Sequence, residues 1–125
     1  MERIISENDL TPIEKHNNLL FKRDDLFIPY EENGVNGGKL RQAIKLLQNI
    51  EDKHIYTYSS LSAPSAPSIA AACKNLGLIC TIYYGGTNIK SALKNHMVRL
   101  TNYYEAYMDF SCKTGRQSAL HHAVS

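Results

Sequence analysis

This chain of 125 residues has few cysteines, and their arrangement disfavours two common stabilising devices. Its three cysteines are Cys73, Cys80 and Cys112. The number is odd and no pair has the Cys-x-x-Cys spacing, which argues against a disulfide framework and against a zinc site. His121 and His122 would point in different directions on a helix, so they do not form a chelating pair. We therefore expect free thiols and no bound metal.

The chain also lacks long apolar runs and clusters of like charge. No stretch is long enough to span a membrane, and the first nine residues have no apolar core typical of a secretory signal. We therefore expect a cytoplasmic protein with no membrane partner. Its 14 lysines and arginines are interspersed with 12 aspartates and glutamates, for a net charge of +2. This pattern offers no basic stripe for a nucleic acid.

What the sequence does contain is the ordinary share of apolar side chains for a folded domain. Hydrophobic residues make up 43% of the chain and charged residues 21%, which are typical values for globular proteins. A chain of this length folds as one domain and can bury roughly two-thirds of its unfolded surface. We expect a single domain that covers residues 1–125.

Alternating strand and helix patterns predict an α/β fold. Apolar residues step by three and four from Leu40 to Ile50, as on one side of a helix, and β-rich runs flank such stretches. After an extended entry at residues 11–15, the predicted strands are 19–28, 54–58, 78–84 and 105–110, and the predicted helices are 40–49, 69–76, 88–100 and 115–125. This alternation indicates a three-layer, mainly parallel sheet with helices on both faces.

Several side chains have ordinary structural interpretations. Arg23 and Asp25 share a face of the first predicted strand, which indicates a solvated ion pair. Thr87 is expected to cap the helix that follows it. His96 falls on the apolar stripe of that helix, so we expect a packed structural histidine. Thr114 and Gln117 have the capping-box spacing of a final helix.

The strongest chemical signal is a glycine-rich loop that leads to Lys39 at a helix start. Gly37 and Gly38 let a ligand approach the main chain. The helix dipole there disfavours the ammonium form of Lys39 and favours the amine, which attacks carbonyl carbons. A Walker A loop is the competitor, but Gly34 is one residue too close and Leu40 replaces the required hydroxyl. On the loop alone, a solvated lysine in a flexible segment is the simpler interpretation.

A second unusual stretch is the loop of serines and prolines at residues 59–68. Hydroxyls and backbone N–H groups gather there at a helix start, where an anion can bind. Ser65 or Ser62 is expected to serve as an ordinary N-cap. Ligands of parallel sheets collect beyond the carboxyl ends of the strands. The loops that carry Lys39, residues 59–68 and Gly85-Gly86 should therefore converge.

Four short motifs resemble one enzyme family. They are Thr11-Pro12-Ile13-Glu14, Lys22-Arg23-Asp24-Asp25-Leu26, Gly37-Gly38-Lys39-Leu40-Arg41 and residues 70–77. In this order and spacing they resemble the pyridoxal-phosphate (PLP) enzymes of the tryptophan-synthase β-like fold, or fold type II. The nearest branch is that of 1-aminocyclopropane-1-carboxylate deaminase and D-cysteine desulfhydrase. The resemblance covers residues 11–125 and implies that Lys39 joins the cofactor aldehyde and then moves protons at the substrate carbon.

The chain departs from that family at positions that bind the cofactor. The family's Ser-Asn pair is replaced by Ala63-Pro64, so Ser62 or Ser65 is expected to substitute in cofactor binding. Gly38 stands where the family has asparagine. The family's phosphate cup lies beyond position 125, so the resemblance implies a truncated N-terminal third that is inactive by itself.

These observations lead to three functional hypotheses. The first is a partial PLP-dependent lyase or deaminase that acts on a small amino acid once completed by the missing region. The second, favoured by Ala63-Pro64 and Gly38, is a non-catalytic α/β interaction module derived from the same family. The third is a phosphate- or nucleotide-binding protein that uses the glycine-rich loop. Apolar surface left uncovered near the C-terminus predicts a homo-oligomer or a partner chain.

Overall fold

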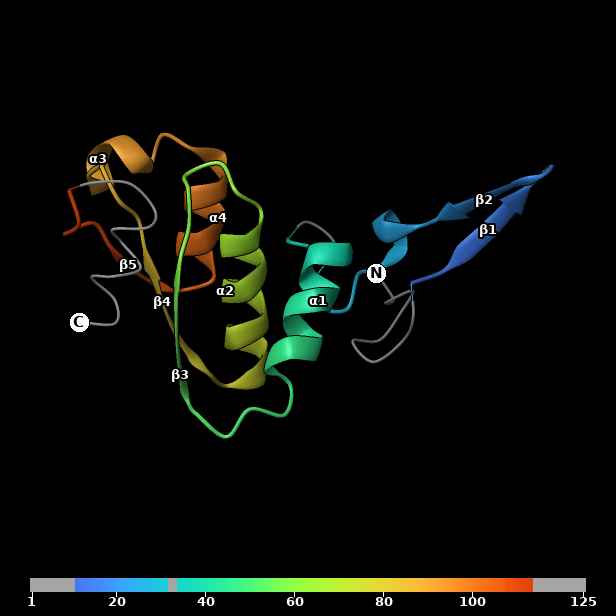
Figure 1. Ribbon diagram of the computed structural model, residues 1–125, viewed down its shortest axis with the longest axis horizontal. Helices are drawn as coiled ribbons and strands as arrows, with labels where there is room; N and C mark the ends of the chain where they lie inside the picture. Colours follow the sequence, from blue (N-terminus) through green and yellow to red (C-terminus); the bar gives the residue numbers. More distant parts are fainter. Residues whose placement is uncertain (1–10, 32–33, 114–125) are drawn as a thin grey trace.

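The computed structural model describes residues 11–31 and 34–113. An N-terminal hairpin is followed by alternating helices and strands (Figure 1). The elements are β1 (Ile13–His16), β2 (Leu19–Lys22), the 3-10 helix η1 (Asp24–Leu26), α1 (Gly38–Leu47), β3 (His54–Tyr58), α2 (Ser65–Leu76), β4 (Ile79–Tyr83), α3 (Ile89–Ala92), α4 (His96–Tyr103) and β5 (Tyr107–Asp109). The strand predicted at residues 54–58 is confirmed at both ends. The helix predicted from residue 115 lies outside the described residues.

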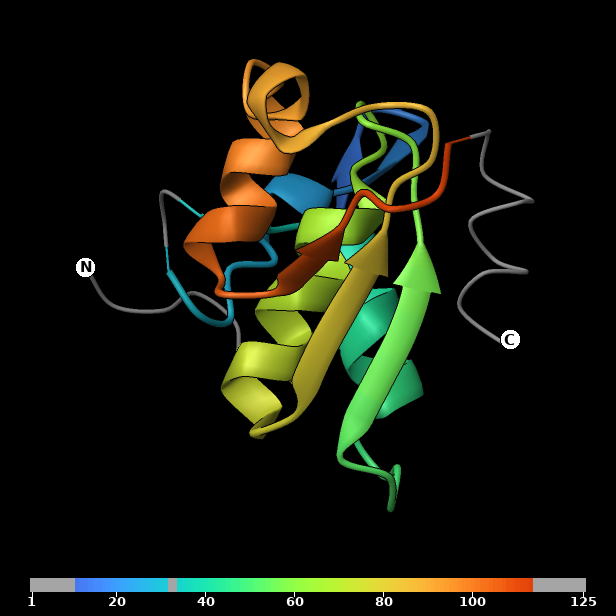
Figure 2. The ribbon, with the colours of Figure 1, turned by 90° about the vertical axis from the view of Figure 1, so that its left-hand side faces the viewer.

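The strands β3, β4 and β5 form a parallel sheet in that order. Each crossover between them contains a helix, the usual connection between parallel strands. α2 packs against β4, while α1 and α4 each pack against α2. Figures 1 and 2 show α1, α2 and α4 on the same side of the sheet, with α1 farthest from it. The predicted α/β fold with a parallel sheet is confirmed.

Side-chain size accounts for the packing of α1 on α2. The stripe predicted for α1 is buried, with Leu40 and Ile44 completely inaccessible to solvent. The opposing helix is rich in alanine, which occupies little space and loses no side-chain entropy on burial. The larger side chains of α1 can therefore pack closely against α2. The residues that these two helices bury are Leu40, Ala43, Ile44, Leu47, Ala66, Pro67, Ser68, Ala70, Ala71, Ala72 and Cys73.

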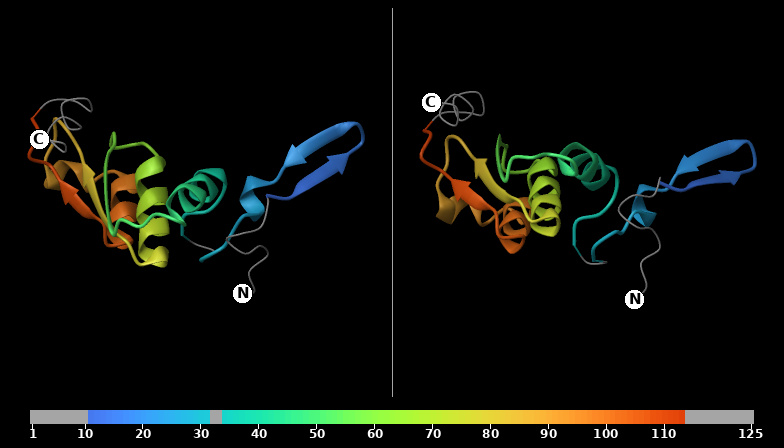
Figure 3. Two further views of the ribbon diagram at one scale, coloured as in Figure 1. Left: turned by 60° about the horizontal axis from the view of Figure 1, so that its bottom comes forward. Right: turned by 90° about the horizontal axis from the view of Figure 1, so that it is seen from below.

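The N-terminal hairpin extends away from this core (Figures 1 and 3). β1 and β2 pair antiparallel and have no third strand beside them in the described part of the chain. The strand predicted for residues 19–28 is wrong beyond Lys22, because Asp24–Leu26 close a 3-10 turn. Leu19 and Leu20 are 63% and 71% exposed. The expected association with a second copy or a partner stays a prediction, and this surface is consistent with it.

No disulfide joins the three cysteines in the described part of the chain, in line with the expected free thiols. Cys73 of α2 and Cys80 of β4 are buried in the core. A hydrogen bond between the two thiols and burial together raise the pKa of Cys80. No helix among residues 11–31 and 34–113 is both long and apolar enough to cross a membrane.

The segment between β4 and β5 differs from the single helix that we predicted. It contains two helices, each started by an asparagine: Asn88 Oδ1 accepts a hydrogen bond from Ser91 N–H (2.9 Å) and Asn95 Oδ1 accepts one from Met97 N–H (2.8 Å). Each asparagine is an N-cap with extended backbone, so α3 ends and α4 begins anew. The predicted cap at Thr87 is therefore wrong. His96 is exposed at the start of α4, so its predicted packing is also wrong.

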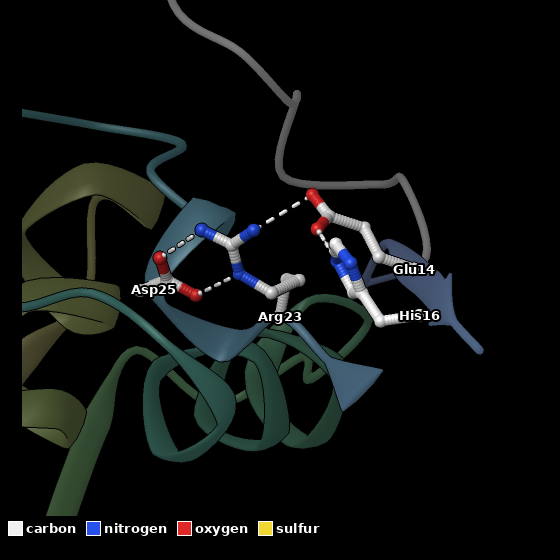
Figure 4. Close-up of polar contacts among 4 residues, drawn as sticks. All are labelled: Glu14, His16, Arg23 and Asp25. Atoms are coloured by element: carbon white, nitrogen blue, oxygen red, sulfur yellow. Dashed lines mark hydrogen bonds and ion pairs between the residues drawn. The ribbon is translucent and has the colours of Figure 1, made fainter. Parts of the chain in front are cut away.

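An ion-pair cluster holds the hairpin to η1 (Figure 4). The guanidinium of Arg23 donates two hydrogen bonds to the Asp25 carboxylate, at 2.8 and 2.6 Å. It donates a third to Glu14 Oε1 at 2.7 Å, and the other oxygen of Glu14 lies 3.1 Å from His16 Nε2. The predicted pair of Arg23 and Asp25 is confirmed, and Arg23 also joins β1 to η1.

This cluster predicts a small loss of stability in acid. Hydrogen bonds from His16 and Arg23 lower the pKa of Glu14, and the hydrogen bonds from Arg23 lower the pKa of Asp25. Carboxylates with lowered folded pKa values stabilise the fold above about pH 4, and this contribution is lost as the pH falls through the folded values. We expect the urea midpoint to decrease more steeply below about pH 4 in the wild type than in Arg23→Gln. Equal slopes would contradict the prediction, and the difference should be small because the Glu14 and Asp25 side chains are 37% and 63% exposed.

Candidate functional site

Lys39 lies in the first turn of α1, at the helix start that the glycine-rich loop predicted. The N-cap is Gly37, with φ of 89° and ψ of −164°, a conformation that is essentially restricted to glycine. The Gly37 N–H donates to Phe27 O at 3.0 Å, and its carbonyl accepts from Arg41 N–H at 3.1 Å. Leu40 is buried while Lys39 is exposed. The loop therefore presents the lysine to solvent from a fixed helix end.

Lys39 lines a cavity of about 600 Å³, which is within the range of roughly 300–1,000 Å³ for ligand pockets. Its walls come from β2, η1, the glycine-rich loop, the starts of α1 and α2, and α4. The lining residues are Lys22, Asp24, Asp25, Gly34, Val35, Asn36, Gly37, Gly38, Lys39, Gln42, Pro64, Pro67, Ser68, Met97 and Leu100. Two of the three loops predicted to converge thus share this cavity, whereas Gly85-Gly86 is not among its lining residues.

One carboxylate stands directly at the start of α1. A methyl group built on Gly38 would lie 3.3 Å from Asp24 Oδ2, so the carboxylate packs closely against the glycine. Asp24 also pairs with Lys22, with Nζ and Oδ1 2.9 Å apart. A negative group at a helix N-terminus is favourable. Asp24 therefore takes the position that a nucleotide phosphate would need in a Walker-type loop.

The two serines proposed as cofactor ligands occupy different places. Ser65 lines a smaller cavity of about 170 Å³ together with Lys39. Ser62 accepts a hydrogen bond from Asn95 Nδ2 at 3.1 Å and lines neither of these cavities. The N-cap of α2 is Pro64, with no side-chain capping bond, so the expected capping by Ser62 or Ser65 is wrong. Proline can start a helix because its ring already fixes φ near the helical value.

The contribution of α4 to this site was not predicted from the sequence. Met97 and Leu100 line the larger cavity. Just beyond the helix, the buried Tyr104 accepts a hydrogen bond from Val35 N–H at 2.8 Å. The two residues are 69 positions apart, and no local pattern in a sequence signals a contact between such distant positions. Burial is the main cause that raises the pKa of Tyr104 to about 12.

The cavity suits the aldehyde of PLP better than its phosphate. Lys39 supplies an amine on its wall, as attachment to an aldehyde requires. A phosphate group needs several N–H donors or a cationic clamp. The α2 end of this cavity contributes Pro64 and Pro67, which have no N–H, and Lys22 is already paired with Asp24. Lys39 therefore suits the attachment of the cofactor, whereas neither the α2 end of the cavity nor Lys22 offers a phosphate cradle.

Comparison with known proteins gives one partial similarity. No family model matches the chain. Over 110 residues it is 26% identical to the O-seryl-dTMP PLP-dependent decarboxylase of Salmonella phage ViI. The match covers 78% of this chain and 25% of the relative, so the chain spans about a quarter of the length of that curated protein. The chain is thus similar to part of a PLP-dependent enzyme.

Proposed function

We propose that this chain is the lysine-bearing part of a PLP-dependent enzyme that acts on a small amino acid. In this proposal Lys39 is the residue to which the cofactor attaches. When bound, PLP supplies an aldehyde that takes up the substrate amine and a ring that withdraws electrons from the substrate carbon. The chain's own contribution is to hold the Lys39 amine at the cavity wall, where it can accept or return a proton.

The observation that carries the proposal is the setting of Lys39. An exposed lysine at a glycine-capped helix start lines a cavity of about 600 Å³, and the similarity to a PLP-dependent decarboxylase supports the same chemistry. The name of that relative describes O-seryl-dTMP, whose seryl group derives from the amino acid serine. This supports an amino-acid substrate here.

The finer parts of the proposal rest on the family resemblance. They are fold type II, a lyase or deaminase reaction, and the roles of Ser62 and Ser65. The proposed cytoplasmic location rests instead on the first nine residues, which have no apolar core typical of a secretory signal. Of the two serines, Ser65 is supported by the small cavity that it lines with Lys39. Because neither the α2 end of the larger cavity nor Lys22 offers a phosphate cradle, we propose that the chain is inactive until another segment or partner supplies one.

The alternative is a non-catalytic interaction module derived from such an enzyme. It is favoured by Asp24, which occupies the start of α1, and by Ser62, whose hydroxyl is engaged by Asn95. The exposed apolar hairpin would then serve a protein contact. The alternative predicts no preferred attachment of PLP to Lys39.

Chemical trapping of PLP tests the proposal. The chain is incubated with PLP, reduced with borohydride and mapped by peptide mass spectrometry. We expect the label predominantly on Lys39, lost in Lys39→Arg and kept in Lys22→Arg, which alters the other lysine of the same cavity. Labels spread over the surface lysines, or unaffected by Lys39→Arg, would reject the proposal and favour the interaction module.

A further inference from the structure

Tyr104 connects the end of α4 to the loop that precedes Lys39. Its hydroxyl accepts a hydrogen bond from Val35 N–H at 2.8 Å and donates one to Glu31 Oε1 at 2.9 Å. The ring is buried, with 4% of its surface exposed. A single hydroxyl therefore contacts both the chain before the glycine-rich loop and the loop itself.

Gly34 leaves the space that the Tyr104 hydroxyl occupies. A Cβ built on Gly34 would lie 2.0 Å from the Tyr104 hydroxyl and 2.6 Å from Glu31 Oε1. Distances this short cannot be accommodated unless these groups shift, so only glycine lets the backbone approach Tyr104 so closely. The missing side chain at Gly34 thus leaves room for the hydroxyl that accepts the hydrogen bond from Val35 N–H.

The loop is also fixed at its other end. Gly37 N–H donates to Phe27 O at 3.0 Å, immediately before α1 begins. The backbone between these two contacts, Gly34 to Gly37, forms part of the cavity wall. Lys39 follows two residues after Gly37, so the position of its amine depends on how this short segment is held.

We infer that Tyr104 is a positioning residue for Lys39, which it serves by holding Val35 and Glu31 in place. The inference rests on the proposed function, because it assigns a purpose to the geometry of Lys39. Tyr104 itself does not line the cavity and acts only through the loop. Burial raises the pKa of Tyr104 to about 12, so its hydroxyl keeps its proton and can donate to Glu31 at neutral pH.

The neighbouring residue Tyr103 provides a matched control. Its hydroxyl donates to the other oxygen of Glu31, at 3.1 Å, but its ring is 57% exposed. Among the hydrogen bonds described for the loop, the one from Val35 N–H goes to Tyr104. Tyr103→Phe and Tyr104→Phe each remove one oxygen and one bond to Glu31, and only Tyr104→Phe also removes the acceptor of Val35.

Two measurements on the full chain test the inference. Amide hydrogen exchange by NMR reports on Val35, and brief acetylation with acetic anhydride reports on Lys39 relative to the exposed Lys90. In Tyr104→Phe we expect exchange at Val35 to accelerate and the relative reactivity of Lys39 to change, each about two- to tenfold, as the loss of one hydrogen bond implies. In Tyr103→Phe both quantities should stay at the wild-type values.

The outcomes separate this inference from the proposed function. Unchanged exchange at Val35 in Tyr104→Phe would overturn the contact. Faster exchange with unchanged reactivity of Lys39, or equal effects in both variants, would show that Tyr104 is merely structural. Should Tyr104→Phe fail to fold, Gly34→Ala gives the same two readouts through displacement of the hydroxyl. Neither readout needs PLP, so failure of PLP to label Lys39 rejects the proposed function without deciding the role of Tyr104.

Discussion

Replacing Leu40 by alanine should lower the free energy of unfolding by about 2–5 kcal/mol, the usual cost of removing a buried leucine side chain. Leu40 is completely buried, and the α1 stripe to which it belongs packs on α2. The alanines of α2 are already small and cannot expand to fill the space, so a cavity should remain. A loss of this size is a large fraction of the stability of a typical domain.

Leu46→Ala is the control for this prediction. Leu46 is also a leucine of α1, but its side chain is 70% exposed. Its replacement should change the free energy of unfolding by less than about 0.5 kcal/mol, since alanine also has a slightly better helix propensity. Urea unfolding followed by circular dichroism measures both variants. Equal losses in the two variants would mean that α1 is not packed as described.

The helical periodicity of α1 was predictable because the buried side of a helix is apolar, so its residues recur in the sequence with the helical period. The apolar positions from Leu40 to Leu47 repeat with the helical period, and the structure buries them together. The strand at residues 54–58 was predictable from its β-branched and aromatic residues between turn signals. Both predictions depend only on residues that are close together in the chain, so their pattern can be recognised without knowledge of tertiary contacts.

The missed features involve competition between local signals or distant contacts. Asp24 and Asp25 lie inside an apolar run that favours a strand, yet their backbone forms η1. Asn95 starts a new helix within a continuous apolar stripe, because its side chain supplies an N-cap that the stripe does not show. Tyr104 contacts Val35 across a separation of 69 positions in the chain. The sequence therefore identified Lys39, its helix and the 59–68 stretch beside it, but not the contributions of η1, α4 and Tyr104.

The glycine at the N-cap of α1 should be the most sensitive backbone position of the candidate site. Gly37→Ala should cost about 1–3 kcal/mol, because a φ near 90° with extended ψ is essentially restricted to glycine. A Cβ at this position would lie 3.4 Å from Asp24 O, an ordinary contact distance. The expected loss thus comes from the backbone conformation rather than from a clash. Relief of the strain would move the start of α1 and Lys39 with it.

Gly77→Ala separates this effect from the general cost of replacing a glycine. Gly77 caps α2 with φ of 75° and ψ of 25°, and a Cβ there would have no heavy atom within 4 Å. The left-handed helical conformation costs alanine roughly 1–2 kcal/mol, partly offset by the reduced entropy of the unfolded chain. We expect Gly77→Ala to be the milder change by urea unfolding, and to leave the acetylation of Lys39 relative to Lys90 at its wild-type value. Gly37→Ala should alter that ratio, and an unaltered ratio would show that the conformation of Gly37 does not determine where the lysine lies.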